Sequence, residues 1–65
     1  MNAIKTTAEK FIKAAEHAGW EFVSKDDDLL MFRRNDELYG CAAMSAQIID
    51  EDTIWGDESV AEYLA

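Results

Sequence analysis

Two clusters of acidic residues are the part of this sequence best suited to hold a cation: Asp26-Asp27-Asp28 and Asp50-Glu51-Asp52. A calcium loop of the EF-hand type needs oxygen ligands at alternate positions, a glycine at the sixth position and a glutamate at the twelfth. Counted from Asp50, Gly56 is the seventh residue and Glu62 is the thirteenth. Because this spacing is wrong for the loop, we interpret both clusters as solvated turns and expect neither a metal site nor a cofactor.

Side chains that commonly carry catalysis are present, but their spacing does not predict an active site. No base lies at a recognisable distance from any of the serines, and Cys41 lies among small apolar residues, where a thiol is usually inert. His17 stands alone and is best understood as a residue in the last turn of a helix, where an imidazolium interacts well with the helix dipole. Paired carboxylates need a pocket that shifts their pKa values before they can act as acid and base. We therefore predict no catalytic residues and no enzymatic activity.

Charge is the most informative property of the composition. The chain has 65 residues, 14 acids and six bases, and its net charge is −8. Residues 1–34 hold all six bases and six acids, so residues 35–65 carry the whole net charge, with eight acids and no base. Such a surface repels a phosphate backbone, since nucleic-acid affinity depends largely on Lys and Arg. It attracts a basic protein surface and speeds the encounter with it.

This imbalance predicts a contact surface for a basic partner protein, in particular one that itself binds nucleic acid. Carboxylates spaced along a fold occupy the Arg and Lys sites that otherwise hold phosphates, which is a form of nucleic-acid mimicry. Trp55 lies between two acidic groups, as a binding hot spot with a charged rim does, although the burial typical of aromatic residues slightly favours a place in the core. The predicted partner-binding residues are Asp36, Glu37, Asp50, Glu51, Asp52, Trp55, Asp57, Glu58 and Glu62.

The acidic half is also compatible with two roles that need no basic partner. In the first, the charge serves only solubility. In the second, the chain is a small homodimeric structural or regulatory subunit. Its two copies pair through the sheet or through the strand bearing Cys41, while the acids face water. In either case, the acidic face makes no specific contact.

Length and apolar content indicate one globular domain over residues 1–65. The chain is 49% apolar, which is ordinary for a folded protein, and its 65 residues are close to the lower limit for an independent core. No apolar run approaches the length of a membrane span, and the first residues lack the basic-then-apolar layout expected of a secretory signal. A single cysteine suits a reducing compartment, so we expect a cytoplasmic protein.

The first element that the pattern predicts is an amphipathic helix that begins near Thr6. Thr6 and Glu9 have the capping-box spacing, after a lead-in of residues 1–5 that we expect to fray. Gly19 is suited to end the helix with a positive φ angle. The apolar positions follow three-and-four spacing along one face: Ala8, Phe11, Ile12, Ala15 and Ala18.

Residues 20–44 then alternate in steps of two and predict a three-stranded antiparallel meander. Three apolar runs, residues 20–25, 29–34 and 37–44, are separated by Asp and Asn turns. Gly40 inside the third run indicates a bulge or a close approach, and the small residues that follow it suggest a helix packed tightly above.

The last third of the chain is ambiguous by pattern. Residues 45–56 fit a strand, a loop or a helical turn, whereas Asp57 is a good N-cap for a short helix over residues 58–64. The prediction is thus a single small α+β domain of α-β-β-β-α order, with both helices on one face of the meander.

In outline, the chain resembles small acidic phage-encoded anti-defence inhibitors of the anti-CRISPR type. The features that carry the resemblance are the small size, the helix–meander–helix order and the acidic run from Ile48-Ile49-Asp50-Glu51-Asp52 through Glu62. It implies a mechanism in which carboxylates are presented to a nucleic-acid-binding groove, and it assigns no residue. The order is also similar to that of small toxin ribonucleases of the HicA type, but these depend on a catalytic histidine in the sheet region and a basic surface. Here His17 lies on the first helix and the surface is acidic, so we reject that interpretation.

Overall fold

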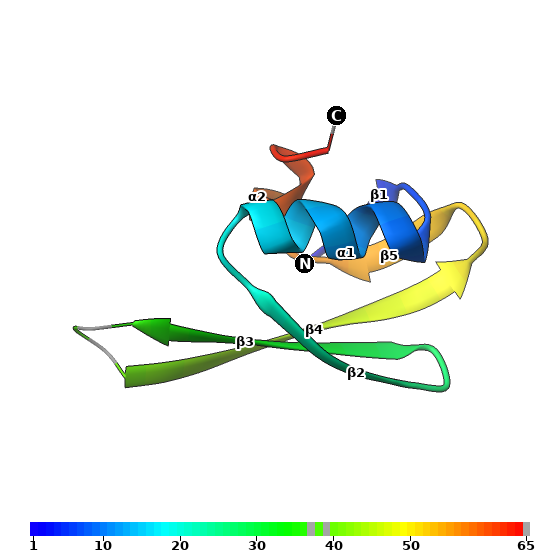
Figure 1. Ribbon diagram of the computed structural model, residues 1–65. Helices are drawn as coiled ribbons and strands as arrows, with labels where there is room; N and C mark the ends of the chain where they lie inside the picture. Colours follow the sequence, from blue (N-terminus) through cyan, green and yellow to red (C-terminus); the bar gives the residue numbers. More distant parts are fainter. Residues whose placement is uncertain (37, 39, 65) are drawn as a thin grey trace.

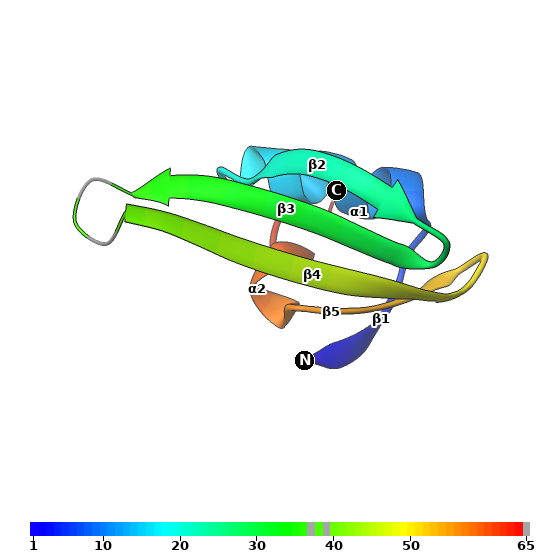
Figure 2. The same ribbon diagram turned by 90° about the horizontal axis from the view of Figure 1, so that it is seen from below.

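One antiparallel sheet forms the body of the protein, and helices cover one of its faces (Figure 1). The computed structural model describes residues 1–36, 38 and 40–64, and in this part of the chain the sheet has five strands in the spatial order β1-β5-β4-β3-β2. In chain order the elements are β1 (Asn2–Lys5), α1 (Ala8–His17), β2 (Glu21–Asp26), β3 (Leu29–Asp36), β4 (Gly40–Asp50), β5 (Thr53–Gly56) and α2 (Glu58–Ala61). Figure 2 shows the opposite face of the sheet, which neither α1 nor α2 covers.

The predicted α+β class is confirmed, but the predicted three-stranded meander lacks two strands. Residues 2–5, expected to fray, form β1 and pair with β5, with Ile4 opposite Ile54. The ambiguous region resolves into the end of β4, a turn and β5. Strands of four residues are too short to show a convincing alternation, and β1 is identified only by a partner some fifty residues further along the chain.

Helix α1 begins one residue later than the capping-box pattern predicted. Thr7 is the N-cap, and its hydroxyl oxygen accepts a hydrogen bond from the backbone N–H of Lys10 at 3.2 Å. Thr6 is buried, and its N–H donates to the carbonyl oxygen of Asp52 at 2.9 Å. Thr6 therefore joins α1 to the turn between β4 and β5 instead of capping the helix. Gly19 ends the helix as expected, with a φ angle of +97°.

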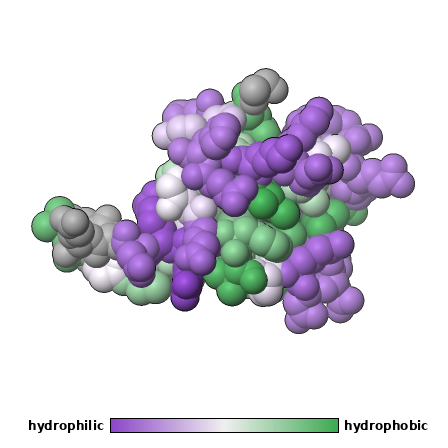
Figure 3. Space-filling model, viewed as in Figure 1, coloured by the Kyte–Doolittle hydropathy of each residue, from purple (hydrophilic) through white to green (hydrophobic). Residues whose placement is uncertain are grey.

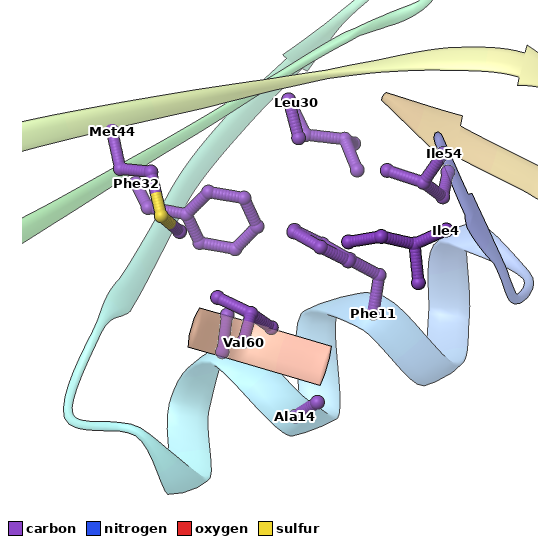
Figure 4. Packing of buried hydrophobic residues seen from close by; sticks show 10 residues of the cluster. Ile4, Phe11, Ala14, Leu30, Phe32, Met44, Ile54 and Val60 are labelled. Carbon is purple, nitrogen blue, oxygen red and sulfur yellow. The ribbon is translucent and has the colours of Figure 1, made fainter. Parts of the chain in front are cut away.

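The core lies between the two helices and the covered face of the sheet (Figure 4). Phe11 of α1 is fully buried and meets Phe32 of β3 edge to face, with 5.9 Å between the ring centroids. Figure 4 shows Val60 of α2 and Ile54 of β5 directed into the same cluster. Beside this core, Figure 3 shows hydrophobic surface beneath α1, framed by hydrophilic side chains.

The hairpin of β3 and β4 extends beyond the helices, and this corrects the expectation of a helix above residues 41–43 (Figure 1). Cys41 is exposed. Gly40 opens β4 with a φ angle of +80°, and a Cβ atom built on it would meet nothing within 4 Å. Gly40 therefore permits the positive φ angle that the chain adopts after the turn. The small residues beside it do not indicate the close approach of a helix.

Trp20 and Arg34 form a contact that the strand pattern did not predict. Strand β2 begins at Glu21, and Trp20 lies before it, with the Arg34 guanidinium carbon 4.4 Å from the centre of its ring. Arg33, which points to the other face, pairs with Glu21, with 2.9 Å between Nε and Oε2. The two adjacent arginines therefore do not form one basic patch.

Helix α2 is shorter than predicted, although its start is confirmed. The carboxylate of the Asp57 N-cap accepts a hydrogen bond from the N–H of Ser59 at 3.0 Å. The helix ends at Ala61 instead of continuing to Leu64. Val60 is fully buried, and Ala61 and Leu64 pack against the core, so the apolar side of this segment faces the sheet as expected.

Gly56 is expected to tolerate no side chain, because a Cβ atom there would lie 2.9 Å from Cζ of the buried Phe11 ring. We predict that Gly56→Ala lowers the free energy of unfolding by about 1–3 kcal/mol, as overpacking of a core does. Urea unfolding measures the loss. Gly40→Ala measures backbone strain alone, roughly 1–2 kcal/mol, since its Cβ meets no atom, whereas Gly56 has no positive φ angle and any loss there comes from the contact with the ring. An unchanged urea midpoint for Gly56→Ala would contradict the tight contact.

Candidate functional site

The two acidic turns lie at the same end of the sheet. Successive turns of an antiparallel meander alternate between its ends, so the β2–β3 and β4–β5 turns share one end, opposite the β3–β4 turn. A backbone hydrogen bond from Ile48 N–H to the Asp28 carbonyl oxygen, at 2.7 Å, joins the β2–β3 turn to β4 two residues before Asp50. We call the resulting cluster of six carboxylates the acidic end: Asp26, Asp27, Asp28, Asp50, Glu51 and Asp52.

The β4–β5 turn is held by the side chain of its first acid. Asp50 Oδ1 accepts a hydrogen bond from Asp52 N–H at 2.9 Å. This bond, with hydrogen bonding from Thr53 and the nearby charge of Lys5, holds the pKa of Asp50 below its ordinary value. Glu51 and Asp52 are exposed beside it. The turn is therefore ordered by one carboxylate and presents two more to solvent.

The β2–β3 turn presents three exposed carboxylates around a shallow hollow. Asp27 has a φ angle of +53°, a conformation that Asp tolerates better than most residues. The hollow has a volume of about 330 Å³ and is lined by Asp26, Asp27, Asp28, Leu29 and Gln47. Carboxylates beside an apolar side chain suit the charged head and aliphatic stem of a Lys or Arg side chain.

Trp55 lies on the uncovered face of the sheet, 42% exposed, while its neighbours Ile54 and Gly56 face the core. The strand register places it in a row that crosses the sheet: Ala3, Trp55, Gln47, Leu29 and Asp26. Leu29 is also exposed, at 41%. The slight preference for a core position of Trp55 is therefore wrong, and its row leads to the acidic end.

The remaining predicted contacts lie elsewhere. Asp57 and Glu58 are at the other end of β5, where hydrogen bonds from Ser59 lower the pKa of Asp57 and Asn2 donates to Glu58 at 2.6 Å. Glu62 follows α2. Asp36 ends β3 at the far hairpin, and Glu37 lies outside the described residues. Of the nine predicted residues, Asp50, Glu51 and Asp52 therefore lie at the acidic end, and Trp55 lies in the cross-strand row that leads to it.

Sequence reasoning missed Asp26, Asp27 and Asp28 as members of the site. They lie in residues 1–34, which have no net charge, so a comparison of net charge between the two halves of the sequence does not single them out. The alternation of turns in the predicted meander was a signal that could have found them, because it puts every second turn at one end.

In residues 1–36, 38 and 40–64, no three His, Cys, Asp or Glu side chains are grouped so as to hold a metal ion. Within the same residues, no helix has the length and apolar character needed to span a membrane.

Comparisons with known proteins do not add to the site. No protein-family model matches the chain, and neither a curated protein nor a solved structure is significantly similar to it. The function must therefore be argued from the chemistry of the surface.

The stability of the fold should depend on pH through Asp50. Because its pKa is lowered in the folded state, its charged form stabilises the fold above the ordinary carboxyl pKa of about 4, and this contribution is lost as the pH falls through the lowered value. We predict that the unfolding temperature of Asp50→Asn falls less than that of the wild type as the pH is lowered from 6 through the pKa of Asp50. Thermal unfolding over a series of pH values measures the difference. Glu51→Gln removes the same charge from the same turn and is the control. Parallel pH curves for Asp50→Asn and the wild type would contradict this role.

Proposed function

We propose that the protein is a non-enzymatic binding protein that inhibits or modulates a basic partner, in particular a nucleic-acid-binding protein. The observation that carries the proposal is the convergence of two acidic turns at one end of the sheet, beside an uncovered face that exposes Trp55. The acidic end supplies the charge, and the row from Trp55 to Leu29 supplies apolar contact area.

Charge supports a basic partner over nucleic acid itself. Lys5 and Lys10 adjoin the β4–β5 turn and Lys25 precedes Asp26, so three bases stand against six carboxylates in this region, and the whole molecule carries −8. A phosphate backbone is repelled by such a field, whereas Arg and Lys side chains form charge-assisted hydrogen bonds with carboxylates. A protein that uses those side chains to bind nucleic acid is therefore a suitable target, and occupation of its groove by carboxylates would block it.

The exposed tryptophan supports a specific contact in addition to electrostatic attraction. Aromatic side chains are enriched at the centres of interfaces, and rim charges mainly set the association rate and the salt dependence. Trp55 is separated from Asp26 by Gln47 and Leu29 in the cross-strand row, so one partner surface can cover both kinds of side chain. The resemblance to acidic anti-defence inhibitors implies only the presentation of carboxylates to a nucleic-acid-binding groove, and the role of Trp55 is proposed from its exposure on the uncovered face.

A second candidate function rests on the same uncovered face. Trp55 and Leu29 give two copies an apolar surface on which to meet, and the protein would then be a homodimeric subunit whose acids serve solubility. Sedimentation equilibrium tests this directly: a mass near twice 7.3 kDa supports the dimer, and a monomer excludes it.

Removal of charge from the acidic end should weaken partner binding. The variant Asp27→Asn, Asp28→Asn, Glu51→Gln removes three charges, spares the hydrogen bond of Asp50 and keeps a side chain suited to the positive φ angle at residue 27. We expect the tagged wild-type chain to capture a basic protein from host lysate at low salt and to release it at high salt. The variant should retain at least tenfold less of that protein, because several charge pairs of about 0.5–1 kcal/mol each are lost.

The matched control removes three charges from other surfaces. Glu9→Gln, Glu16→Gln, Glu62→Gln has the same net charge as the acidic-end variant but leaves both turns intact. It should capture the partner nearly as well as the wild type. Equal losses in both variants would show that net charge alone is responsible, and equal retention in both would refute the acidic end as the contact.

Replacement of Trp55 should reduce affinity with little effect on folding. The side chain of Trp55 is on the uncovered face, so Trp55→Ala leaves no cavity in the core. We expect the dissociation rate of the captured partner to rise by about tenfold or more, as for a hot-spot residue, while the urea midpoint changes little. Surface plasmon resonance with the purified partner measures the rate. Trp20→Phe, which alters the aromatic ring beside Arg34, is the matched control.

A further inference from the structure

A cavity between α1 and the segment that follows α2 has a character opposite to that of the acidic end. It has a volume of about 240 Å³ and is lined by Lys10, Lys13, Ala14, His17, Tyr63 and Leu64. The three basic residues lie one turn apart along one side of α1, and the other three supply a methyl group, a ring and a branched aliphatic chain. In a chain of net charge −8 with only six Lys and Arg residues, this is a local concentration of positive charge.

The floor and the outer wall of the cavity are held by the fold. Ala14 is buried as a member of the core cluster, and its small side chain lines the cavity beside Lys10 and Lys13. The outer wall is kept in place by hydrogen bonds from Tyr63 N–H to the Val60 carbonyl oxygen at 3.0 Å and from Leu64 N–H to the Ala61 carbonyl oxygen at 3.1 Å. Val60 is fully buried, so this short segment is anchored to the core from which the wall extends.

The basic side chains at the rim are available to a ligand. Lys10, Lys13 and His17 are exposed, and among the described residues the ion pair found is that of Arg33 with Glu21, on the other face of the sheet. Glu9 and Glu16 belong to the same helix but do not line the cavity. An adjoining hollow of about 360 Å³ shares Lys10 and Leu64, but its other lining residues are all polar or charged: Lys5, Thr6, Thr7 and Asp52.

We propose that this cavity binds a small organic anion that has an apolar body, such as an aromatic or short acyl carboxylate. The apolar body lies over Ala14 and Leu64 against the Tyr63 ring, and the anionic group lies at the rim between Lys10 and Lys13. Ligand sites commonly combine an apolar lining with a few polar groups that fix orientation, which is the composition of this cavity. The proposal is independent of the acidic end, because of the residues that line the cavity Lys10 and Leu64 alone also line the hollow that contains Asp52.

The test uses anilinonaphthalene sulfonate, a fluorescent apolar anion, as the probe for the folded chain. We expect saturable binding of one probe per chain. Lys13→Gln should weaken the binding by about fivefold, as loss of one exposed charge interaction does. Lys25→Gln, which removes a lysine from β2, is the matched control and should bind as the wild type does. Phenylnaphthylamine, which lacks the sulfonate, should bind less tightly and should not distinguish the two variants.

Two further variants locate the probe. Tyr63→Ala removes the exposed wall without touching the core and should weaken both probes, whereas Trp55→Ala should have no effect. Equal affinity of Lys13→Gln and Lys25→Gln for anilinonaphthalene sulfonate would overturn the proposal. Loss of probe binding in Trp55→Ala would also overturn it, because the probe would then lie on the uncovered face of the sheet. The acidic-end variant should bind the probe at least as well as the wild type, so a failure here is distinct from a failure of partner capture.

Discussion

The packing of Phe11 against the sheet is the contact on which the rest of the structure depends. Its ring meets Phe32 on β3, and lies so close to Gly56 on β5 that no side chain fits there. One residue of α1 thus fixes the height of the helix above strands on both sides of β4. Among the described residues, ten hydrophobic side chains are buried in the core, so a single central ring of this size contributes a large share of the apolar burial.

Because the helices occupy one face only, the other face of the sheet is left to solvent or to a partner. Side chains alternate along a strand, so burial of Ile54 and Gly56 obliges Trp55 to point away from the core. The same alternation exposes Leu29 next to the buried Leu30. The apolar part of the candidate surface is therefore a direct consequence of one-sided packing, and it lies beside the carboxylates because strand register links Trp55 to Asp26.

Charge in this protein is organised into regions of opposite sign. Carboxylates gather at the end of the sheet where two turns meet, whereas Lys10, Lys13 and His17 gather along α1 beside the segment that follows α2. The contact surface proposed at the acidic end and the anion site proposed beside α1 are compatible in one small domain, since their charged groups lie on different elements. The first depends on turns, and the second depends on how α2 and its following segment cover α1.

The sequence by itself determined the local features: the amphipathic α1, the glycine that ends it, the Asp57 cap and the α+β class, because each depends on neighbours within a few residues. It also indicated the acids of the β4–β5 turn. Only the tertiary structure decided that residues 2–5 form a strand, that Trp55 is exposed, and that Asp26–Asp28 join Asp50–Asp52 while Asp57, Glu58 and Glu62 lie apart. Those outcomes depend on pairing between distant segments and on which face the helices cover, and neither is encoded in the spacing of any one segment.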